Sequence, residues 1–363
     1  MNQIVVGLSE FSETYVEARE KFLGTASKAG ARIKSYQHEL LAGPSGEPLF
    51  IDAAYLGSPD AEKVLVSGTG TYGIEGFPGS VVQTHWLNRY NAVPLPRDST
   101  HAHNPWGFAN ALRFTEENVD LNRNFIDFDE PLPATPFYER VQRIICRPDW
   151  RAEDSLSIFD ELAILRSKIG EQAFSDAFSG GQYSHADGIF YGGVRERWSD
   201  RTFRLAVSEH ASGAKAAAIV DLHTGIGPRY RHIFLCFRPE NSVAYERARA
   251  WWGVRAINGE GVTHKAVAKY QGLLVDAFAS ILSGADTTTI VVEFGTVPRE
   301  RRQGTSMAAR WLMSSQAGDP VLRSGPLRDI RQNYYPSAPA WRAAVPQRSG
   351  TIIDAALHAL SHG

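Results

Sequence analysis

The chain has 363 residues, of which 43% are apolar and 21% charged, a composition typical of ordered globular proteins and not of disordered or fibrous ones. Its 38 basic and 40 acidic residues give a net charge of −2, so charge gives no reason to expect nucleic acid or an anionic membrane as a partner. Two cysteines, Cys146 and Cys236, are too few for a disulfide framework or a thiolate zinc site. Because there is no signal-like N-terminus and no bilayer-spanning apolar run, we expect a cytoplasmic protein.

The first predicted element is a helix over residues 12–29. Ser12 is available as its N-cap, and the apolar residues Val16, Phe22, Leu23 and Ala26 recur near helical spacing. We therefore expect the chain to open on an amphipathic helix.

Short apolar runs then alternate with helical segments along the chain. Buried strands are predicted at residues 64–66, 216–220 and 289–292, because runs of this length and composition are typical of strands covered on both faces. Helices are predicted around the stripe Ile158, Leu162, Leu165 and Ile169, and at 307–312. This alternation indicates one α/β domain over residues 1–363, with a central mixed, mostly parallel sheet flanked by helices. In such sheets the chemistry lies beyond the carboxyl ends of the strands.

The first strand runs into a glycine-rich turn over residues 67–76. The spacing Gly68-x-Gly70-x-x-Gly73 matches a dinucleotide-binding fingerprint, which requires an acidic residue about 20 positions further on to hold a ribose. Asp98 comes later than that and is expected in a loop. Nicotinamide dinucleotide binding is therefore an alternative of lower rank.

Polar side chains also follow the two later strands. His223 comes two residues after Asp221, which can orient the imidazole ring, and both stand at the end of the second strand. Glu293 ends the third strand, where a carboxylate in a partly apolar crevice would gain the basicity that a general base needs. Each residue also has a plainer interpretation: a histidine that caps a turn, and a glutamate paired with a neighbouring arginine.

A fourth polar stretch covers residues 113–125. In it Arg123 stands between Asn122 and Asn124, an arrangement suited to forked recognition of a carboxylate or carbonyl. Taken alone, this stretch is equally consistent with a surface loop.

Together these stretches resemble the zinc carboxypeptidase-like superfamily, which includes the succinylglutamate desuccinylase and aspartoacylase branch, and most of all a bacterial family within it. The resemblance covers nearly the whole chain, and its most specific motifs are DLNRNF at 120–125, DLHTG at 221–225 and EFGT at 293–296. It implies a single α/β domain with a zinc site and hydrolase activity of the metallo-carboxypeptidase or amidohydrolase type.

The resemblance also implies roles for individual residues. Glu75 and His223 match metal ligands, and Tyr72 stands where the family has the first histidine ligand. Glu293 matches the general base, and Arg113 matches the arginine that polarises the scissile carbonyl. The substrate-carboxylate binders correspond to Asn122 and Arg123.

The phenol at position 72 departs from the pattern. Zinc sites normally use His, Cys or carboxylate ligands, and a tyrosine must lose its proton before it can bind the metal. His85, His101, His103 and His185 are other histidines that could take its place. Zinc is therefore the expected cofactor, with its third ligand as the open question.

Two functions follow from this pattern. The first is metal-dependent hydrolysis of an amide bond in a small peptide or N-acyl amino acid, with a metal-activated water and Glu293 as general base. The alternative is a metal-poor or non-catalytic descendant that binds carboxylate ligands through Asn122 and Arg123. For both functions we expect the partner to be a small molecule or short peptide that bears a carboxylate. We expect no nucleic acid and no membrane as a partner.

Overall fold

The computed structural model describes residues 10–58, 60–89, 97–147, 155–253, 268–314 and 320–362. The N-terminal segment, for which the sequence predicts no secretory signal, lies mostly outside these ranges. In the described part of the chain, no helix is both long and apolar enough to cross a bilayer.

The strands form one seven-stranded sheet in the order β1-β2-β4-β3-β5-β7-β6. Strands β4, β3, β5 and β7 are parallel neighbours, whereas β2 and β6 run antiparallel to the strands beside them. The strand bounds are β1 (Arg32–Ala42), β2 (Pro48–Leu56), β3 (Lys63–Thr69), β4 (Arg97–His101), β5 (Ala216–Gly225), β6 (His232–Leu235) and β7 (Asp286–Gly295). The predicted mixed, mostly parallel α/β sheet is confirmed.

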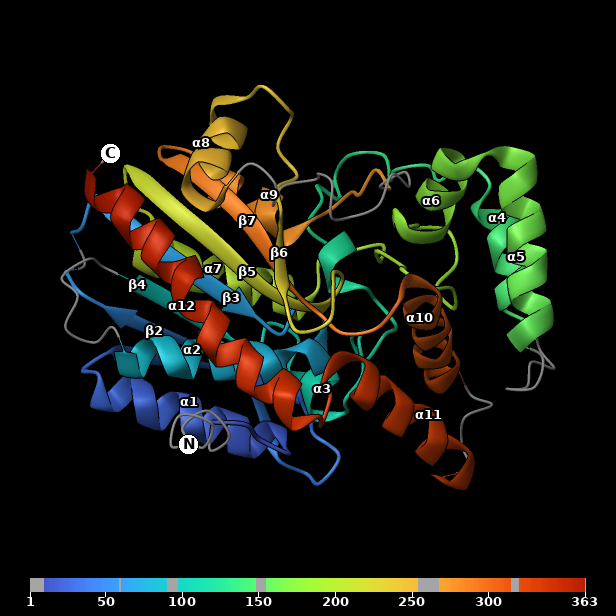
Figure 1. Ribbon diagram of the computed structural model, residues 1–363, viewed down its shortest axis with the longest axis horizontal. Coiled ribbons are helices and arrows are strands. Elements are labelled where there is room, and N and C mark those ends of the chain that lie inside the picture. Colours follow the sequence, from blue (N-terminus) through green and yellow to red (C-terminus); the bar gives the residue numbers. More distant parts are fainter. Residues whose placement is uncertain are drawn as a thin grey trace.

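Helices cover both faces of this sheet, and a further group lies at one end of the molecule (Figure 1). The α-helices are α1 (Tyr15–Lys28), α2 (Gly76–Arg89), α3 (Pro105–Ala109), α4 (Tyr138–Ile145), α5 (Ser155–Ile169), α6 (Glu171–Ser179), α7 (Trp198–Ala211), α8 (Val243–Trp252), α9 (Leu274–Ile281), α10 (Arg299–Met313), α11 (Pro320–Tyr334) and α12 (Pro339–His362). Two short 3₁₀ helices, η1 (Gly73–Glu75) and η2 (Leu121–Arg123), complete the fold.

Alternate residues of the central strands serve two hydrophobic cores. Leu65 and Val220 belong to the core under α2, α8 and α12, whereas Val66 and Ile219 belong to the core under α7 and α9. This two-sided burial explains why the strands read as continuous apolar runs and not as alternating patterns.

The predicted strands are present and longer than expected, whereas β1, β2, β4 and β6 were not predicted. The first helix is also present, but its N-cap is Thr14, whose hydroxyl accepts from the backbone N–H of Glu17. Ser12 instead donates its backbone N–H to the hydroxyl of Tyr335. Val16 is 39% exposed, so it does not belong to the buried face that Phe22 and Ala26 form.

The expectation that Asp98 lies in a loop is wrong, because it belongs to β4 and pairs in register with Val66 of β3. Its buried carboxylate lies 3.6 Å from Nδ1 of His210 on α7. This position is near the amino end of β4, whereas the glycine-rich turn follows the carboxyl end of the parallel strand β3. A ribose-binding acid would have to lie at the carboxyl end, so the geometry disfavours the dinucleotide alternative.

Candidate active site

A cavity of about 710 Å³ opens beyond the carboxyl ends of β3, β5 and β7. Parallel strands bring their carboxyl ends to one edge of the sheet, so residues far apart in the sequence meet there. All seven residues singled out in the sequence line this cavity: Tyr72, Glu75, Arg113, Asn122, Arg123, His223 and Glu293.

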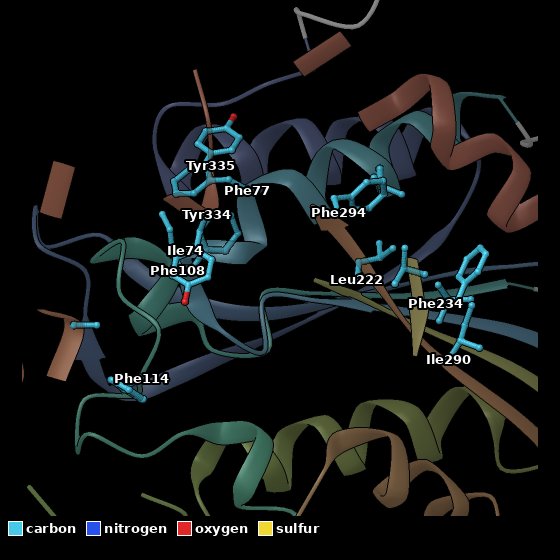
Figure 2. Packing of buried hydrophobic residues seen from close by; sticks show 14 of the residues in the cluster. Ile74, Phe77, Phe108, Phe114, Leu222, Phe234, Ile290, Phe294, Tyr334 and Tyr335 are labelled. Carbon is cyan, nitrogen blue, oxygen red and sulfur yellow. The ribbon is translucent and has the colours of Figure 1, made fainter. Parts of the chain in front are cut away.

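Glu75 is positioned by the tight turn that precedes it. Gly73 has φ +45°, and a Cβ there would lie 2.1 Å from the carbonyl oxygen of Leu112, so only glycine fits without a shift of the backbone. The next residue, Ile74, is fully buried and lies in a group with Phe77, Phe108, Tyr334 and Tyr335 (Figure 2). Because Ile74 is anchored in this core, the adjacent Glu75 is held at the cavity.

His223 lies between two carboxylates. Its Nε2 is 2.7 Å from Oδ2 of Asp221, and its Nδ1 is 3.2 Å from Oε2 of Glu75, which also accepts the backbone N–H of Thr224 at 2.9 Å. Burial acts to lower the pKa of His223, but Asp221 and Glu75 outweigh that effect and raise the pKa well above 6.5. These two carboxylates therefore favour the protonated form of the ring.

Arg113 is the central cation of the site. Its guanidinium lies 3.4 Å from Oε1 of Glu75 and 3.4 Å from Oδ2 of Asp120, and both carboxylates are almost completely buried. The guanidinium carbon also lies 3.3 Å from the centre of the Tyr72 ring, which is a cation–π contact. Arg113 therefore neutralises Glu75 from within the protein.

Tyr72 faces the polar 3₁₀ helix η2. Its hydroxyl accepts hydrogen bonds from Nδ2 of Asn122 at 3.1 Å and from Nη1 of Arg123 at 3.4 Å. Oδ1 of Asn122 in turn accepts the backbone N–H of Leu274 at 2.7 Å, which ties η2 to the start of α9. The phenol is thus part of a hydrogen-bond network that spans three segments.

Arg123 is 2% exposed, yet its hydrogen-bond partners in the described part of the chain are all neutral. Nη1 donates to the carbonyl of Asn122 at 2.6 Å and Nη2 to the carbonyl of Ser179 at 2.9 Å, while Nε has no partner in the described structure. The negative charge of Asp120 acts on Arg123 from nearby, and the free Nε keeps a donor that an anion can accept from.

Glu293 lies on β7 in register with His223 on β5. Its Oε2 accepts the backbone N–H of Ile226 at 3.0 Å. Burial raises the pKa of Glu293 to about 7, and the negative charge of the nearby Glu75 adds to the rise. A carboxyl with this pKa can accept or donate a proton at neutral pH.

As arranged, these side chains do not fit a metal ion. In the described ranges no group of three His, Cys, Asp or Glu side chains is placed to hold one. Both ring nitrogens of His223 face carboxylates, Glu75 is engaged by Arg113 and His223, and the Tyr72 hydroxyl accepts from Asn122 and Arg123. Zinc needs three or four deprotonated donors that point at one centre, and this set does not provide them.

The other histidines do not supply the missing donor. His101 and His103 are fully buried behind the cavity, where burial lowers the pKa of His101 to about 3 and that of His103 to about 4. His103 lies between the hydroxyls of Thr71 and Thr100. His85 lies near Glu10 and His185 near Glu139, and none of the four lines the cavity.

The sequence matches the family described as "Protein of unknown function (DUF2817)" over residues 11–348. The chain belongs to the DUF2817 family. No curated protein gives a match.

Among solved structures, this DUF2817 protein is similar to the following three. Thrombin activatable fibrinolysis inhibitor has a TM-score of 0.49 and 10% identity, covering 100% of this chain and 78% of that one. Carboxypeptidase A from Helicoverpa armigera has a TM-score of 0.46 and 10% identity, covering 84% and 73%. Succinylglutamate desuccinylase from Chromobacterium violaceum has a TM-score of 0.35 and 14% identity, covering 82% and 75%.

Sequence reasoning missed several residues of this DUF2817 cavity. Asp120 holds Arg113, and Arg229, Arg299, Arg301 and Arg302 line the cavity wall. The three arginines at 299–302 begin α10 four residues after β7 ends, so their position after a strand end was the available signal. Arg229 follows β5 in the same way.

Proposed function

We propose that this cavity binds a short peptide or an N-acyl amino acid through its terminal carboxylate. The observation that carries the proposal is Arg123, a buried guanidinium at the cavity wall whose hydrogen bonds go to neutral groups and whose Nε has no partner in the described structure. Charged hydrogen bonds to a carboxylate would satisfy Nε and compensate the buried charge. The cavity volume of about 710 Å³ suits a ligand of this size.

The test compares an N-acetyl dipeptide that has a free C-terminal carboxylate with its C-terminal amide. We expect the carboxylate to bind at least about tenfold more tightly, since a charged, forked hydrogen bond is lost in the amide. Calorimetric titration gives both dissociation constants, and a chelator should leave them unchanged because binding here needs no metal. Arg123→Lys keeps the positive charge but not the fork, and we expect it to reduce the difference between the two ligands. Equal affinities for acid and amide in the unaltered protein would rule out the proposed binding mode.

A second candidate function is hydrolysis of an amide bond in the same ligand, which the sequence predicts to be metal-dependent. Two observations favour it: the pKa of Glu293 lies near 7, and the Asp221–His223–Glu75 arrangement holds an imidazole in a fixed orientation. In this function Glu293 takes a proton from the attacking water and gives it to the leaving amine. Arg113 would then stabilise the charge that develops on the carbonyl oxygen.

Glu293→Gln separates this role from a structural one. In the folded protein the pKa of Glu293 is about 7, above the ordinary value of 4.5, so the folded state binds more protons between these pH values. The contribution of Glu293 to the free energy of unfolding therefore falls as pH rises from about 4.5 to about 7, and glutamine removes that loss. We expect the variant to be the more stable protein at pH 8, and to hydrolyse acyl amino acids about 100-fold more slowly or worse.

Urea unfolding at pH 5 and pH 8 measures the first effect, and release of the free amino acid measures the second. If the difference in free energy of unfolding between the variant and the unaltered protein did not grow from pH 5 to pH 8, the pKa of Glu293 would not be raised in the folded protein. Undiminished hydrolysis by the variant would exclude Glu293 as the base.

A further inference from the structure

The wall of the cavity carries far more positive than negative charge. Six arginines line it, namely Arg113, Arg123, Arg229, Arg299, Arg301 and Arg302, whereas Glu75 and Glu293 are the carboxylates among its described lining residues. Over the whole chain, by contrast, 38 basic residues face 40 acidic ones. The positive charge is therefore concentrated at the cavity and does not reflect the general composition.

The arginines of α10 and of the loop after β5 differ in their hydrogen-bond and ion-pair partners. Arg299 pairs with Glu171 at 3.2 Å, and Arg302 donates to the carbonyls of Gly225 and Val297. Arg229 and Arg301 are exposed, and within the described ranges neither is seen with a carboxylate partner. Arg229 lies 5.1 Å from the centre of the Tyr230 ring, so two guanidinium groups without a carboxylate partner in the described ranges line the cavity, together with Arg302, which is bound to neutral carbonyls.

The interior between these arginines and Arg123 is wide and partly apolar. Its lining includes Phe178, Phe237, Tyr270 and Leu273. A volume of about 710 Å³ holds a ligand of several residues, because pockets of roughly 300–1,000 Å³ enclose drug-sized molecules. Arg123 and the exposed arginines Arg229 and Arg301 all belong to the lining of this one cavity.

We propose that the ligand is an acidic peptide, whose terminal carboxylate binds Arg123 and whose acidic side chains bind Arg229, Arg301 and Arg302. This inference rests on the proposed function, since it places the terminal carboxylate in the same cavity. The chemical reason is charge complementarity: several carboxylates on one ligand match guanidinium groups for which the described structure shows no carboxylate partner.

The experiment uses calorimetric titration of the full chain with two tetrapeptides that end in alanine with a free carboxylate. One carries three glutamates before the alanine, and the other carries three glutamines. Proteins to compare are the unaltered chain, the double variant Arg229→Ala/Arg301→Ala, and the control Arg140→Ala/Arg328→Ala, which removes two exposed arginines that do not line the cavity.

We expect the glutamate peptide to bind the unaltered protein about fivefold or more tightly than the glutamine peptide at low salt, with a smaller difference at high salt. The double variant should lose this preference while its affinity for the glutamine peptide stays the same, and the control should keep it. If both peptides bind the unaltered protein equally, the acidic preference is refuted and the proposed carboxylate binding stands. If neither binds, the proposed function itself fails. A single-stranded oligonucleotide that displaces the glutamate peptide at lower concentration would also overturn the proposal.

Discussion

Tyr72→His is expected to raise the affinity of the protein for zinc by about 100-fold, judged from the 10–100-fold effects of changes around metal sites. An imidazole at position 72 completes a His-x-x-Glu pair with Glu75, and His223 provides the third donor. Neutral imidazole needs no deprotonation at pH 7, whereas a phenol does. His223 must give up its proton to bind metal, so the affinity of the variant should also rise with pH. Zinc titration with a competing chelator at several pH values measures both effects.

Tyr72→Phe is the matched control for this experiment. It keeps the ring on which Arg113 stacks and removes only the hydroxyl that accepts from Asn122 and Arg123. We expect no gain in zinc affinity from it. If zinc affinity were the same in the histidine variant and in the unaltered protein, Glu75 and His223 could not be a pair of ligands. If the histidine variant bound zinc and also hydrolysed acyl amino acids faster, the hydrolase candidate would gain over simple carboxylate binding.

Arg113→Met is expected to lower the free energy of unfolding by about 3–5 kcal/mol, the range observed when one partner of a buried ion pair is removed. The methionine leaves Glu75 and Asp120 without their shared cation, and the side chains of both carboxylates are at most 2% exposed. The loss of the cation–π contact with Tyr72 adds to the destabilisation. Urea unfolding at neutral pH measures the change.

Arg113→Lys serves as the comparison, because it retains the charge but cannot reach both carboxylates with a planar fork. We expect it to lose less stability than the methionine variant, and it also provides a measurement if the methionine variant fails to fold. If Arg113→Met lowered the free energy of unfolding by less than about 1 kcal/mol, the ion pairs of Arg113 would be as weak as surface salt bridges. That result would contradict their role as buried ion pairs.

The sequence predicted the central strands well because they are buried on both faces. Residues 64–66, 216–220 and 289–292 are largely apolar runs, and they lie within β3, β5 and β7 respectively. The outer strand β1 alternates weakly and is mostly exposed, and β4 is the polar run RDSTH, so neither has the apolar signal of a strand. Asp98 was misplaced for this reason: its strand is defined by hydrogen bonds to β2 and β3 and not by its side chains.

The candidate site could be predicted as far as strand ends define it. Tyr72, His223 and Glu293 follow or end strands, and the rule that chemistry gathers at the carboxyl ends was enough to bring them together. The sequence could not predict which of these side chains form hydrogen bonds or ion pairs with one another. The hydrogen bond from Asn122 to the Tyr72 hydroxyl and the ion pair between Arg113 and Glu75 depend on contacts between distant segments, for which the linear order carries no signal.

The hydrogen bonds that build the cavity join residues very far apart in the chain. Glu75 meets His223 across 148 positions, and Asn122 meets Leu274 across 152. Contacts of this separation form slowly, since long loops must close before they contribute. During synthesis the ribosome must release β7 and α10 before any ligand can be held, because Glu293 and Arg301 come so late in the sequence. The cavity is therefore among the last parts of the protein to become complete, and a chain interrupted before residue 286 would have much of its sheet but no binding site.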